Sequence, residues 1–326
     1  MNSKMRNKIL SSGLVIGLLG SALVGCGQTQ NAAVNSVGGN TAQTANQTAG
    51  QTINQEAVND EAVSEVQQSE AVALEGLEDV DYSSDFEGIN GCAVFYCAVQ
   101  KQGQVYNMDI AQKEASHCST FKIVSTLMGL HEGVLKDVNT TMGYDGKNQY
   151  PFDAWNTDLN LKDAFASSCV WYFRKVIDGV GQEKTAEMLK DLGYGNCDIS
   201  QWQGSGTNGT PDLDGFWLES SLKISPMEQV QVLVKIFEEQ AVFTEEERST
   251  LKDVMLVEEN EGYKVYGKTG TGYGDNAWFV GFVEKNGENE YFALRLNEES
   301  LKGEKSMTIT GGKAKEIALK IIANRK

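Results

Sequence analysis

The chain has 326 residues and a formal charge of -17, from 28 lysine and arginine side chains against 45 aspartate and glutamate side chains. This balance argues against a nucleic-acid partner, because phosphate groups require a basic face. Two histidines in the whole chain also argue against a catalytic zinc site, which usually takes two or three of them, so we expect no metal.

Residues 1–25 have the pattern of a secretory signal. Three basic side chains within the first eight residues precede Ile9 to Gly25, an apolar stretch too short and too rich in glycine for a comfortable membrane span. It ends in Leu23-Val24-Gly25-Cys26, which resembles the lipobox of bacterial lipoproteins, where the cysteine is lipid-modified and becomes the new N-terminus. The alternative is an ordinary signal peptide with a chance cysteine. We expect an exported protein that the lipid on Cys26 anchors to the bacterial cell membrane, facing outward.

Residues 26–81 follow as a segment rich in Gln, Asn, Thr and Ala, and every aromatic residue of the chain lies at or beyond Tyr82. Such a composition cannot bury enough apolar area to offset the entropy lost on ordering. We therefore expect a disordered tether after the lipidated Cys26, and a catalytic domain over residues 82–326.

The domain begins and ends with strand patterns. Cys92 to Val99 and Gln104 to Asp109 predict a hairpin. Three more strands are predicted near the C-terminus, the last two joined by the turn signal Asn286-Gly287: Tyr263 to Lys268, Ala277 to Glu284 and Tyr291 to Leu296. Cys92 and Cys97 lie on opposite faces of one strand, so a disulfide between them is not expected.

The middle of the domain is predicted to be helical. Capping boxes begin two helices, at Ser225 and Thr244, because each hydroxyl is followed three residues later by glutamate. Further helices are predicted at Asn160 to Ile177, Gln182 to Leu192 and Lys313 to Asn324. The sequence thus predicts an α+β fold in three layers, with an antiparallel sheet from both chain ends, flanking helices and an inserted helical lobe.

Ser119 and Lys122 are the first candidates for chemistry. Three residues apart on a helix, they lie within side-chain reach, and a serine needs an adjacent base to become a nucleophile. The S-x-x-K pattern also occurs at Ser220 and at Ser249, but only Ser119 precedes a helix that is apolar nearly all round. Phe121 belongs to the apolar wall that would favour a neutral amine on Lys122. The alternative is a helix-start serine beside a snorkelling lysine.

Two further motifs follow in the chain. Lys268-Thr269-Gly270, with Thr271 next, ends a predicted strand with a cation, a hydroxyl and a bare backbone, which suit an anionic, extended substrate. The alternative is a plain strand end with a polar turn. Ser168, in Ser168-Cys169-Val170, has a hydroxyl suited to relaying a proton toward a leaving group.

Taken in order, S-x-x-K, S-x-V and K-T-G resemble the active-site motifs of the penicillin-recognising serine enzymes. Ser-Thr-Phe-Lys at Ser119 and valine at Val170 are similar to the class D, oxacillinase-type β-lactamases. Phe216-Trp217-Leu218-Glu219 and the stretch Ala277 to Glu284 agree with that family, and the likeness spans nearly all of residues 85 to 325.

The resemblance implies a hydrolase of β-lactam antibiotics, acting on the cyclic amide bond and giving antibiotic resistance. Ser119 would form an acyl-enzyme, and Lys122, carboxylated by carbon dioxide, would serve as general base. The backbone amides of Ser119 and Thr271 would form the oxyanion hole. Two residue sets complete the site that the resemblance implies. The carbamate would be walled by Phe121, Val170, Trp217 and Leu218. Lys268 and Thr269 would hold the substrate carboxylate, with Gly270 and Thr271 also binding substrate, and Lys268 would join Ser119, Lys122 and Ser168 as a catalytic residue.

Two features depart from the family pattern. Many members carry an arginine after the last strand to hold the substrate carboxylate, whereas this chain offers Lys313. Cys118 and Cys169 flank motif residues, and we interpret their thiols as inert core atoms, with a redox-sensitive role as the alternative. His117 is interpreted as a local structural residue, because its adjacent position does not aim the ring at the Ser119 hydroxyl.

Two other functions stay open. A covalent β-lactam receptor would acylate but deacylate slowly, although such sensors usually follow a bundle of membrane helices. A penicillin-binding transpeptidase or carboxypeptidase would normally carry asparagine at the position of Val170. Valine favours the carboxylated lysine, because an amide side chain there would bring water to the lysine's pocket.

Overall fold

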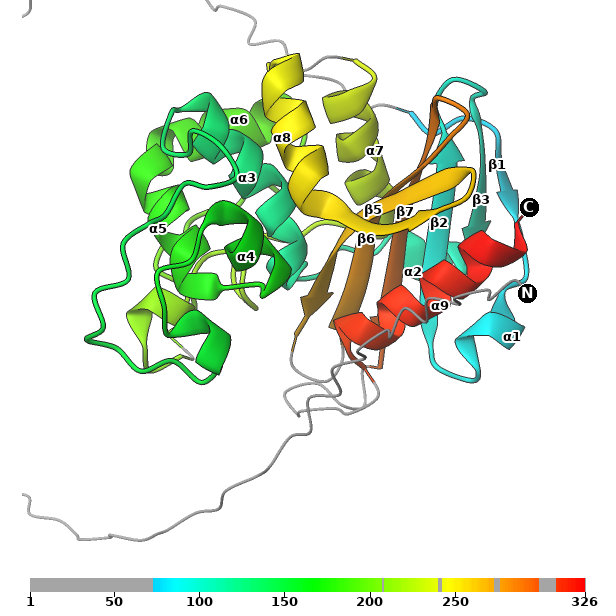
Figure 1. Cartoon of the computed structure of the whole chain (residues 1–326). Helices are drawn as coiled ribbons and strands as arrows, with labels where there is room; N and C mark the ends of the chain where they lie inside the picture. Colours follow the sequence, from blue (N-terminus) through cyan, green and yellow to red (C-terminus); the bar gives the residue numbers. More distant parts are fainter. Residues whose placement is uncertain (1–72, 207, 240–241, 273–275, 299–308, 326) are drawn as a thin grey trace, which may run out of the picture. The chain divides into compact units, whose positions relative to one another are not determined.

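A seven-stranded sheet forms the centre of the fold in the computed structural model, which describes residues 73–206, 208–239, 242–272, 276–298 and 309–325 (Figure 1). Its strands lie in the order β1-β3-β2-β7-β6-β5-β4. By its internal contacts the chain divides into Met1–Val63 and Ser64–Lys326, and every described residue belongs to the second unit. The predicted signal, Cys26 and the tether up to residue 72 lie outside the described residues.

The sheet takes its strands from both ends of the domain, as predicted. The strands are β1 (Leu77–Asp79), β2 (Gly91–Cys97), β3 (Gln102–Tyr106), β4 (Leu256–Asn260), β5 (Tyr263–Thr271), β6 (Asn276–Lys285) and β7 (Glu288–Asn297). β2 joins the two sets by pairing antiparallel with β7, with Val94 opposite Ala293. Asn286 and Gly287 form the predicted turn between β6 and β7, both with positive φ.

The two edge strands were not predicted. β1 pairs in parallel with β3, with Glu78 opposite Gln104, so the folded part begins before Tyr82 and the predicted tether is too long at its C-terminal end. β1 is held by backbone hydrogen bonds on the edge of β3, and it therefore needs no apolar run that a sequence pattern would reveal. β4 is largely exposed and acidic, with the sequence Leu-Val-Glu-Glu-Asn, which gives an equally weak strand signal.

One face of the sheet is covered by α9 (Gly311–Asn324) and α1 (Ser83–Phe86), which pack there as the outer layer (Figure 1). Ile317 and Ile321 of α9 pack in one cluster with Phe95 and Phe279 of the sheet. The opposite face carries the alternate side chains, among them Val94 of β2, in a second and larger cluster. The sheet is therefore buried on both faces.

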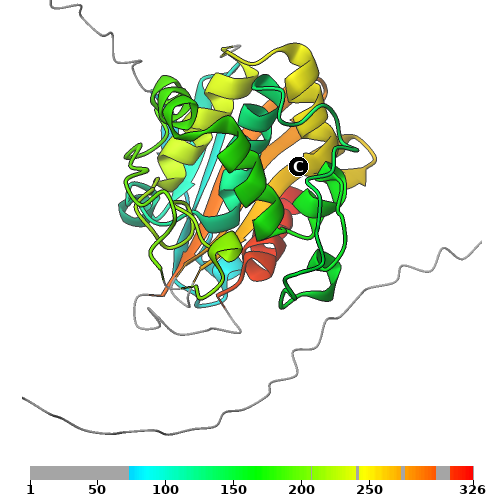
Figure 2. The same ribbon diagram turned by 90° about the vertical axis from the view of Figure 1, so that its left-hand side faces the viewer.

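The second face is covered by the helical lobe, which lies in front of the sheet in Figure 2. Its α-helices are α2 (Met108–Ala111), α3 (Lys122–His131), α4 (Leu161–Ala166), α5 (Val170–Val180), α6 (Gln182–Leu192), α7 (Pro226–Phe237) and α8 (Glu245–Met255). Its 3₁₀ turns are η1 (Cys118–Phe121), η2 (Asp153–Trp155) and η3 (Pro211–Leu213). This arrangement confirms the predicted three-layer α+β fold with an inserted helical lobe.

Two local predictions failed: the strand predicted over Gln104 to Asp109 ends at Tyr106, before α2 begins at Met108, and one predicted helix is broken. The capping boxes at Ser225 and Thr244 are both formed. The single helix predicted over Asn160 to Ile177 is wrong, because the chain breaks between α4 and α5, where Ser168 has a φ of 57°. That break sets the S-x-V motif in a turn, with Val170 as the first residue of α5.

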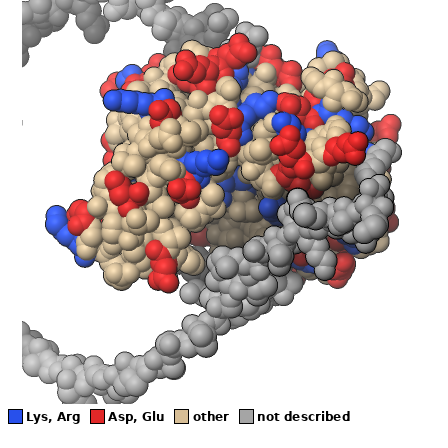
Figure 3. Space-filling model, in the orientation of Figure 1, with Lys and Arg blue, Asp and Glu red and all other residues tan. Residues whose placement is uncertain are grey.

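Charged side chains of both signs are interspersed over the face of the domain drawn in Figure 3. The acidity of the chain therefore forms no continuous patch on that face. None of the helices in the described ranges combines the length and the hydrophobicity that a transmembrane span requires. The five cysteines of this part of the chain are all free.

Candidate active site

The nucleophile candidate lies where η1 runs into α3, at the centre of the domain. Ser119 is partly exposed, and Lys122, one turn later, is fully buried beneath it. Lys122 Nζ donates a hydrogen bond to Ser119 Oγ over 2.9 Å. The serine hydroxyl is thus open to a ligand on one side and touches a buried amine on the other.

Burial makes Lys122 a far better base than a lysine at the surface. The loss of hydration lowers the pKa of its ammonium to about 8, with the nearby Cys169 and Cys118 acting weakly in the opposite sense. Its Nζ lies 5.4 Å from the ring centroid of Phe173, which offers no proton acceptor of ordinary strength. At pH 7 about one tenth of this amine is neutral.

An aromatic wall surrounds this pair. Trp217 stacks on Phe121 with ring centroids 5.7 Å apart and an interplanar angle of 26°. The indole Nε1 of Trp217 is buried and donates to no acceptor in the described part of the chain. Because a buried N–H is normally hydrogen-bonded, this donor suits an oxygen acceptor that the described residues do not supply. The residues present therefore fit a carboxylated lysine, the group that the sequence resemblance implies.

A cavity of about 270 Å³ opens beside η1, the turn that carries the candidate nucleophile Ser119 and is called the nucleophile turn below. Val170 and Leu218 form part of its wall. It is lined by Cys118, Phe152, Val170, Asn208, Leu213, Asp214, Leu218, Glu219, Thr271 and Gly272. Apolar side chains and backbone meet here next to the predicted oxyanion hole, as a small amide-containing ligand requires.

The K-T-G motif lies at the end of β5, alongside η1. A side chain at Gly270 would place its Cβ 2.6 Å from the carbonyl oxygen of His117, so only glycine allows this close approach of β5 to the nucleophile turn. Thr269 is half-buried, and Thr271 is exposed and accepts a hydrogen bond from the backbone N–H of Gly311 over 2.9 Å. The motif is therefore held between the nucleophile turn and α9.

Lys268 is buried in the same cluster. Burial and the positive charges of Lys122 and Lys315 lower the pKa of its ammonium to about 7. Its Nζ donates to the carbonyl of Thr269 over 3.3 Å and lies 5.6 Å from the ring of Phe165. An anion bound beside Lys268 would replace the missing hydration and favour its charged form.

Ser168 lies in the turn between α4 and α5, where its backbone N–H donates to the carbonyl of Phe165 over 3.2 Å. The neighbouring Cys169 and Phe173 are close to Lys122. Among the described residues no hydrogen bond joins the Ser168 hydroxyl to Ser119 or Lys122. The structure thus places this turn beside the cluster, without a direct contact of its hydroxyl with the reacting pair.

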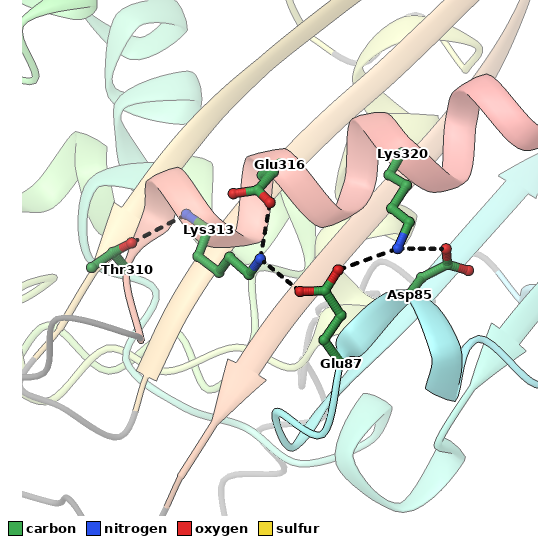
Figure 4. Close-up of polar contacts among 6 residues, drawn as sticks. All are labelled: Asp85, Glu87, Thr310, Lys313, Glu316 and Lys320. Carbon is green, nitrogen blue, oxygen red and sulfur yellow. Dashed lines mark hydrogen bonds and ion pairs between the residues drawn. The ribbon is translucent and has the colours of Figure 1, made fainter. Parts of the chain in front are cut away.

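Among the predicted site residues that the structure describes, Lys313 is the one whose side chain points away from the cluster. Its ammonium lies 3.3 Å from Glu87 and 2.9 Å from Glu316 and points along α9 toward α1 (Figure 4). The prediction that Lys313 holds the substrate carboxylate therefore needs correction, because two carboxylates already engage its charge.

Lys315 is a cation beside the K-T-G strand that no sequence motif singled out. It lines a cavity of about 260 Å³ together with Lys268 and Thr269. No sequence signal was available for it, because its place beside Thr269 depends on how α9 packs, with Gly311 one turn earlier against Thr269.

His117 is fully buried, and neither ring nitrogen has a hydrogen-bond partner among the described residues. Its ring packs edge-on against Phe121, with centroids 5.5 Å apart, and lies 5.2 Å from the ring of Tyr194. Burial lowers its pKa to about 3, so the imidazole is neutral at any physiological pH. This side chain packs and does not act as the base for Ser119.

The described residues also hold no group of three or more His, Cys, Asp or Glu side chains placed to bind a metal.

Comparison with known proteins gives consistent matches over this domain. The model of the penicillin binding protein transpeptidase domain matches residues 62–323. The regulatory protein BlaR1 of Staphylococcus aureus is 34% identical over 244 residues, which cover 74% of this chain and 40% of that protein. The chain thus spans about two fifths of this relative's length.

Two other similar proteins match over most of their own length. The probable β-lactamase YbxI of Bacillus subtilis is 32% identical over 232 residues, covering 71% of this chain and 82% of that protein. The crystal structure of a class D β-lactamase from Bacillus subtilis superposes with a TM-score of 0.65 at 31% identity, covering 75% of this chain and 95% of the other.

Proposed function

Because the chain belongs to the transpeptidase-domain family of the penicillin-binding proteins, with class D β-lactamases among its relatives, we propose that it hydrolyses β-lactam antibiotics through a serine acyl-enzyme. The observation that carries the proposal is the 2.9 Å contact between the partly exposed Ser119 Oγ and the buried Lys122 Nζ. The proposed substrates are β-lactams, the class that the names of the relatives give, and the proposed reaction opens their cyclic amide.

Acylation uses groups that already lie in place. Ser119 Oγ attacks the lactam carbonyl carbon, and its proton leaves toward the general base carried by Lys122, whose side chain already contacts the hydroxyl. The backbone amides of Ser119 and Thr271 stabilise the charge that develops on the carbonyl oxygen, a contribution of about 3 kcal/mol per donor in other enzymes. As the ring opens, Ser168 is proposed to pass its hydroxyl proton to the lactam nitrogen and to take in exchange the proton that the base on Lys122 received from Ser119.

We further propose that Lys122 is carboxylated. The unpartnered Nε1 of Trp217 and the neutral amine of Lys122 support this reading, because the first needs an acceptor and only the second reacts with carbon dioxide. Val170 and Leu218 would keep water from the group. When bound, carbon dioxide supplies the general base for acylation and for deacylation.

Lys268 and Thr269 are proposed to hold the carboxylate of the substrate. Lys268 gains its full charge when an anion approaches, since burial holds its pKa near 7 in the free protein. Lys315, which shares a cavity with both residues, is proposed in place of Lys313 as the second cation. An acidic protein would thus bind an anionic ligand through a local cluster of lysines.

For the N-terminal region we keep the proposal of a cleaved signal and a lipid on Cys26. The supporting feature is the sequence Leu23-Val24-Gly25-Cys26. Mass spectrometry of protein extracted from bacterial membranes should find diacylglycerol on Cys26 as the first residue. Recovery of an unmodified Cys26 in a mature secreted form would refute the anchor.

A covalent penicillin receptor is the second candidate, favoured by the likeness to BlaR1 and to the C-terminal domain of the Bacillus licheniformis BlaR penicillin receptor. The two functions differ only in deacylation, so the test is turnover. The full chain is mixed with excess benzylpenicillin, with and without bicarbonate, and hydrolysed product is counted per protein molecule. Many products per protein, increased by bicarbonate, support the hydrolase, whereas a single equivalent supports the receptor.

A further inference from the structure

Glu219 lies between the two backbone segments that would bind the developing oxyanion. Its Oε1 accepts a hydrogen bond from the thiol of Cys118, the residue before Ser119, over 3.4 Å. The same oxygen lies against Gly272, the residue after Thr271, where an added Cβ would be 1.9 Å away. One carboxylate oxygen thus touches the neighbours of both predicted amide donors.

The backbone of Glu219 is tied to the same place. Its N–H donates to Ser116 Oγ over 2.9 Å. The carbonyl of Ser116 accepts hydrogen bonds from Asn276 Nδ2 and from Trp278 Nε1, the latter over 3.0 Å, and both side chains belong to β6. The turn that holds Glu219, the segment before Ser119 and the start of β6 therefore form one connected unit.

Backbone conformation points to the same unit. Cys118 has a φ of 51° and Glu219 a φ of 49°, values that side-chain-bearing residues seldom adopt. Such conformations persist where the surroundings fix them, and they gather at functional sites. Gly272 has no positive φ, so its missing side chain serves the approach of Glu219 rather than the backbone turn.

We propose that Glu219 is a positioning residue that holds the amides of Ser119 and Thr271 at the spacing that binds the oxyanion. The inference rests on the proposed serine acyl-enzyme chemistry and concerns acylation, the step that a hydrolase and a receptor share. Glu219 acts through Cys118 and Gly272. Burial and the nearby carboxylate hold the pKa of the Cys118 thiol well above its usual value, so the thiol stays a hydrogen-bond donor.

The test is a double-mutant cycle between Glu219 and Gly272 in the full chain. Glu219→Ala removes the carboxylate, and Gly272→Ala displaces it with a methyl group. Stopped-flow acylation by a fluorescent penicillin yields the acylation rate constant and the dissociation constant of the non-covalent complex separately. Gly209→Ala is the matched control, because a Cβ there meets no atom within 4 Å and the backbone has no positive φ.

We expect each single variant to lower the acylation rate constant by about 10- to 100-fold, somewhat less than the loss of a whole oxyanion donor. The dissociation constant should change by less than about threefold, because the substrate groups still meet their own partners. In the double variant Gly272→Ala should add less than about threefold to the effect of Glu219→Ala. Glu219→Gln, which keeps the size and an acceptor oxygen, should restore most of the rate.

Three results would overturn the proposal: full acylation rate in Glu219→Ala, effects of the two substitutions that multiply, or Glu219→Gln as slow as Glu219→Ala. Thermal unfolding without ligand tests the contact independently in the four proteins of the cycle, which are the wild type, Glu219→Ala, Gly272→Ala and the double variant. The two substitutions together should lower the unfolding temperature by less than the sum of their separate effects. A decrease equal to that sum would count against the contact. If the unmodified chain forms no adduct, the proposed function fails, and the unfolding cycle still decides whether Glu219 joins the two segments.

Discussion

Replacing Trp217 by phenylalanine should separate the binding of carbon dioxide from the packing of the site. The smaller ring can keep its stacking on Phe121, whereas the indole N–H is lost. A hydrogen bond to a charged group contributes about 1.5–3 kcal/mol. Loss of this donor should therefore weaken carbon dioxide binding on Lys122 by about 10- to 100-fold.

Trp171→Phe is the matched control. Trp171 is equally buried, but its Nε1 donates to the carbonyl of Trp155 over 2.9 Å. In buffer free of carbon dioxide, Trp171→Phe loses this hydrogen bond and leaves a buried carbonyl unsatisfied, at a cost of about 1–3 kcal/mol. Trp217→Phe should be less destabilising by about that amount, because the Trp217 N–H has no acceptor to lose.

The assay is a titration with ¹³C-labelled bicarbonate, in which the carbamate carbon on Lys122 gives a resolved NMR signal. Wild-type protein and Trp171→Phe should saturate at similar concentrations, and Trp217→Phe should need about 10- to 100-fold more. Equal saturation of all three proteins would refute the assignment of Trp217 as a donor. Absence of the signal in the wild-type protein would refute carboxylation itself.

Three other predictions follow from the same geometry. The pKa of His117 falls from an ordinary 6.5 to about 3 on folding. Below pH 6.5 the unfolded chain therefore binds a proton at His117 that the folded chain does not. This difference should lower the free energy of unfolding by about 2 kcal/mol between pH 7 and pH 5. Urea unfolding should find that loss reduced in His117→Phe, and an unchanged loss would contradict the assigned burial. Lys315→Ala should raise KM for benzylpenicillin about tenfold and Lys313→Ala less than twofold, and the reverse order in steady-state kinetics would restore the sequence-based assignment. Ser119→Ala should form no covalent adduct by mass spectrometry, and an adduct in that variant would place the nucleophile elsewhere.

The sequence predicted those parts of the fold whose burial leaves a pattern. β2, β6 and β7 are buried on both faces and read as apolar runs, and the capping boxes at Ser225 and Thr244 fix two helix starts. β1 and β4 escaped prediction because each lies at an edge of the sheet, where backbone hydrogen bonds rather than apolar side chains hold the strand.

The motifs singled out Ser119, Lys122 and the K-T-G strand, which the fold brings together. They could not tell whether Lys313 or Lys315 lies near Lys268 and Thr269. That depends on which side of α9 faces β5, and the position of the N-cap at Thr310 determines it. The role proposed for Glu219 was equally hidden. It depends on three segments distant in the chain that meet only in the folded domain.

Time-resolved mass spectrometry of the full chain with excess benzylpenicillin distinguishes hydrolysis from stable acylation. A serine hydrolase should acquire one adduct on Ser119, lose it as the substrate is exhausted, and release many molecules of opened lactam per protein. Persistence of a single stoichiometric adduct after the free antibiotic is removed would contradict hydrolysis and identify a receptor.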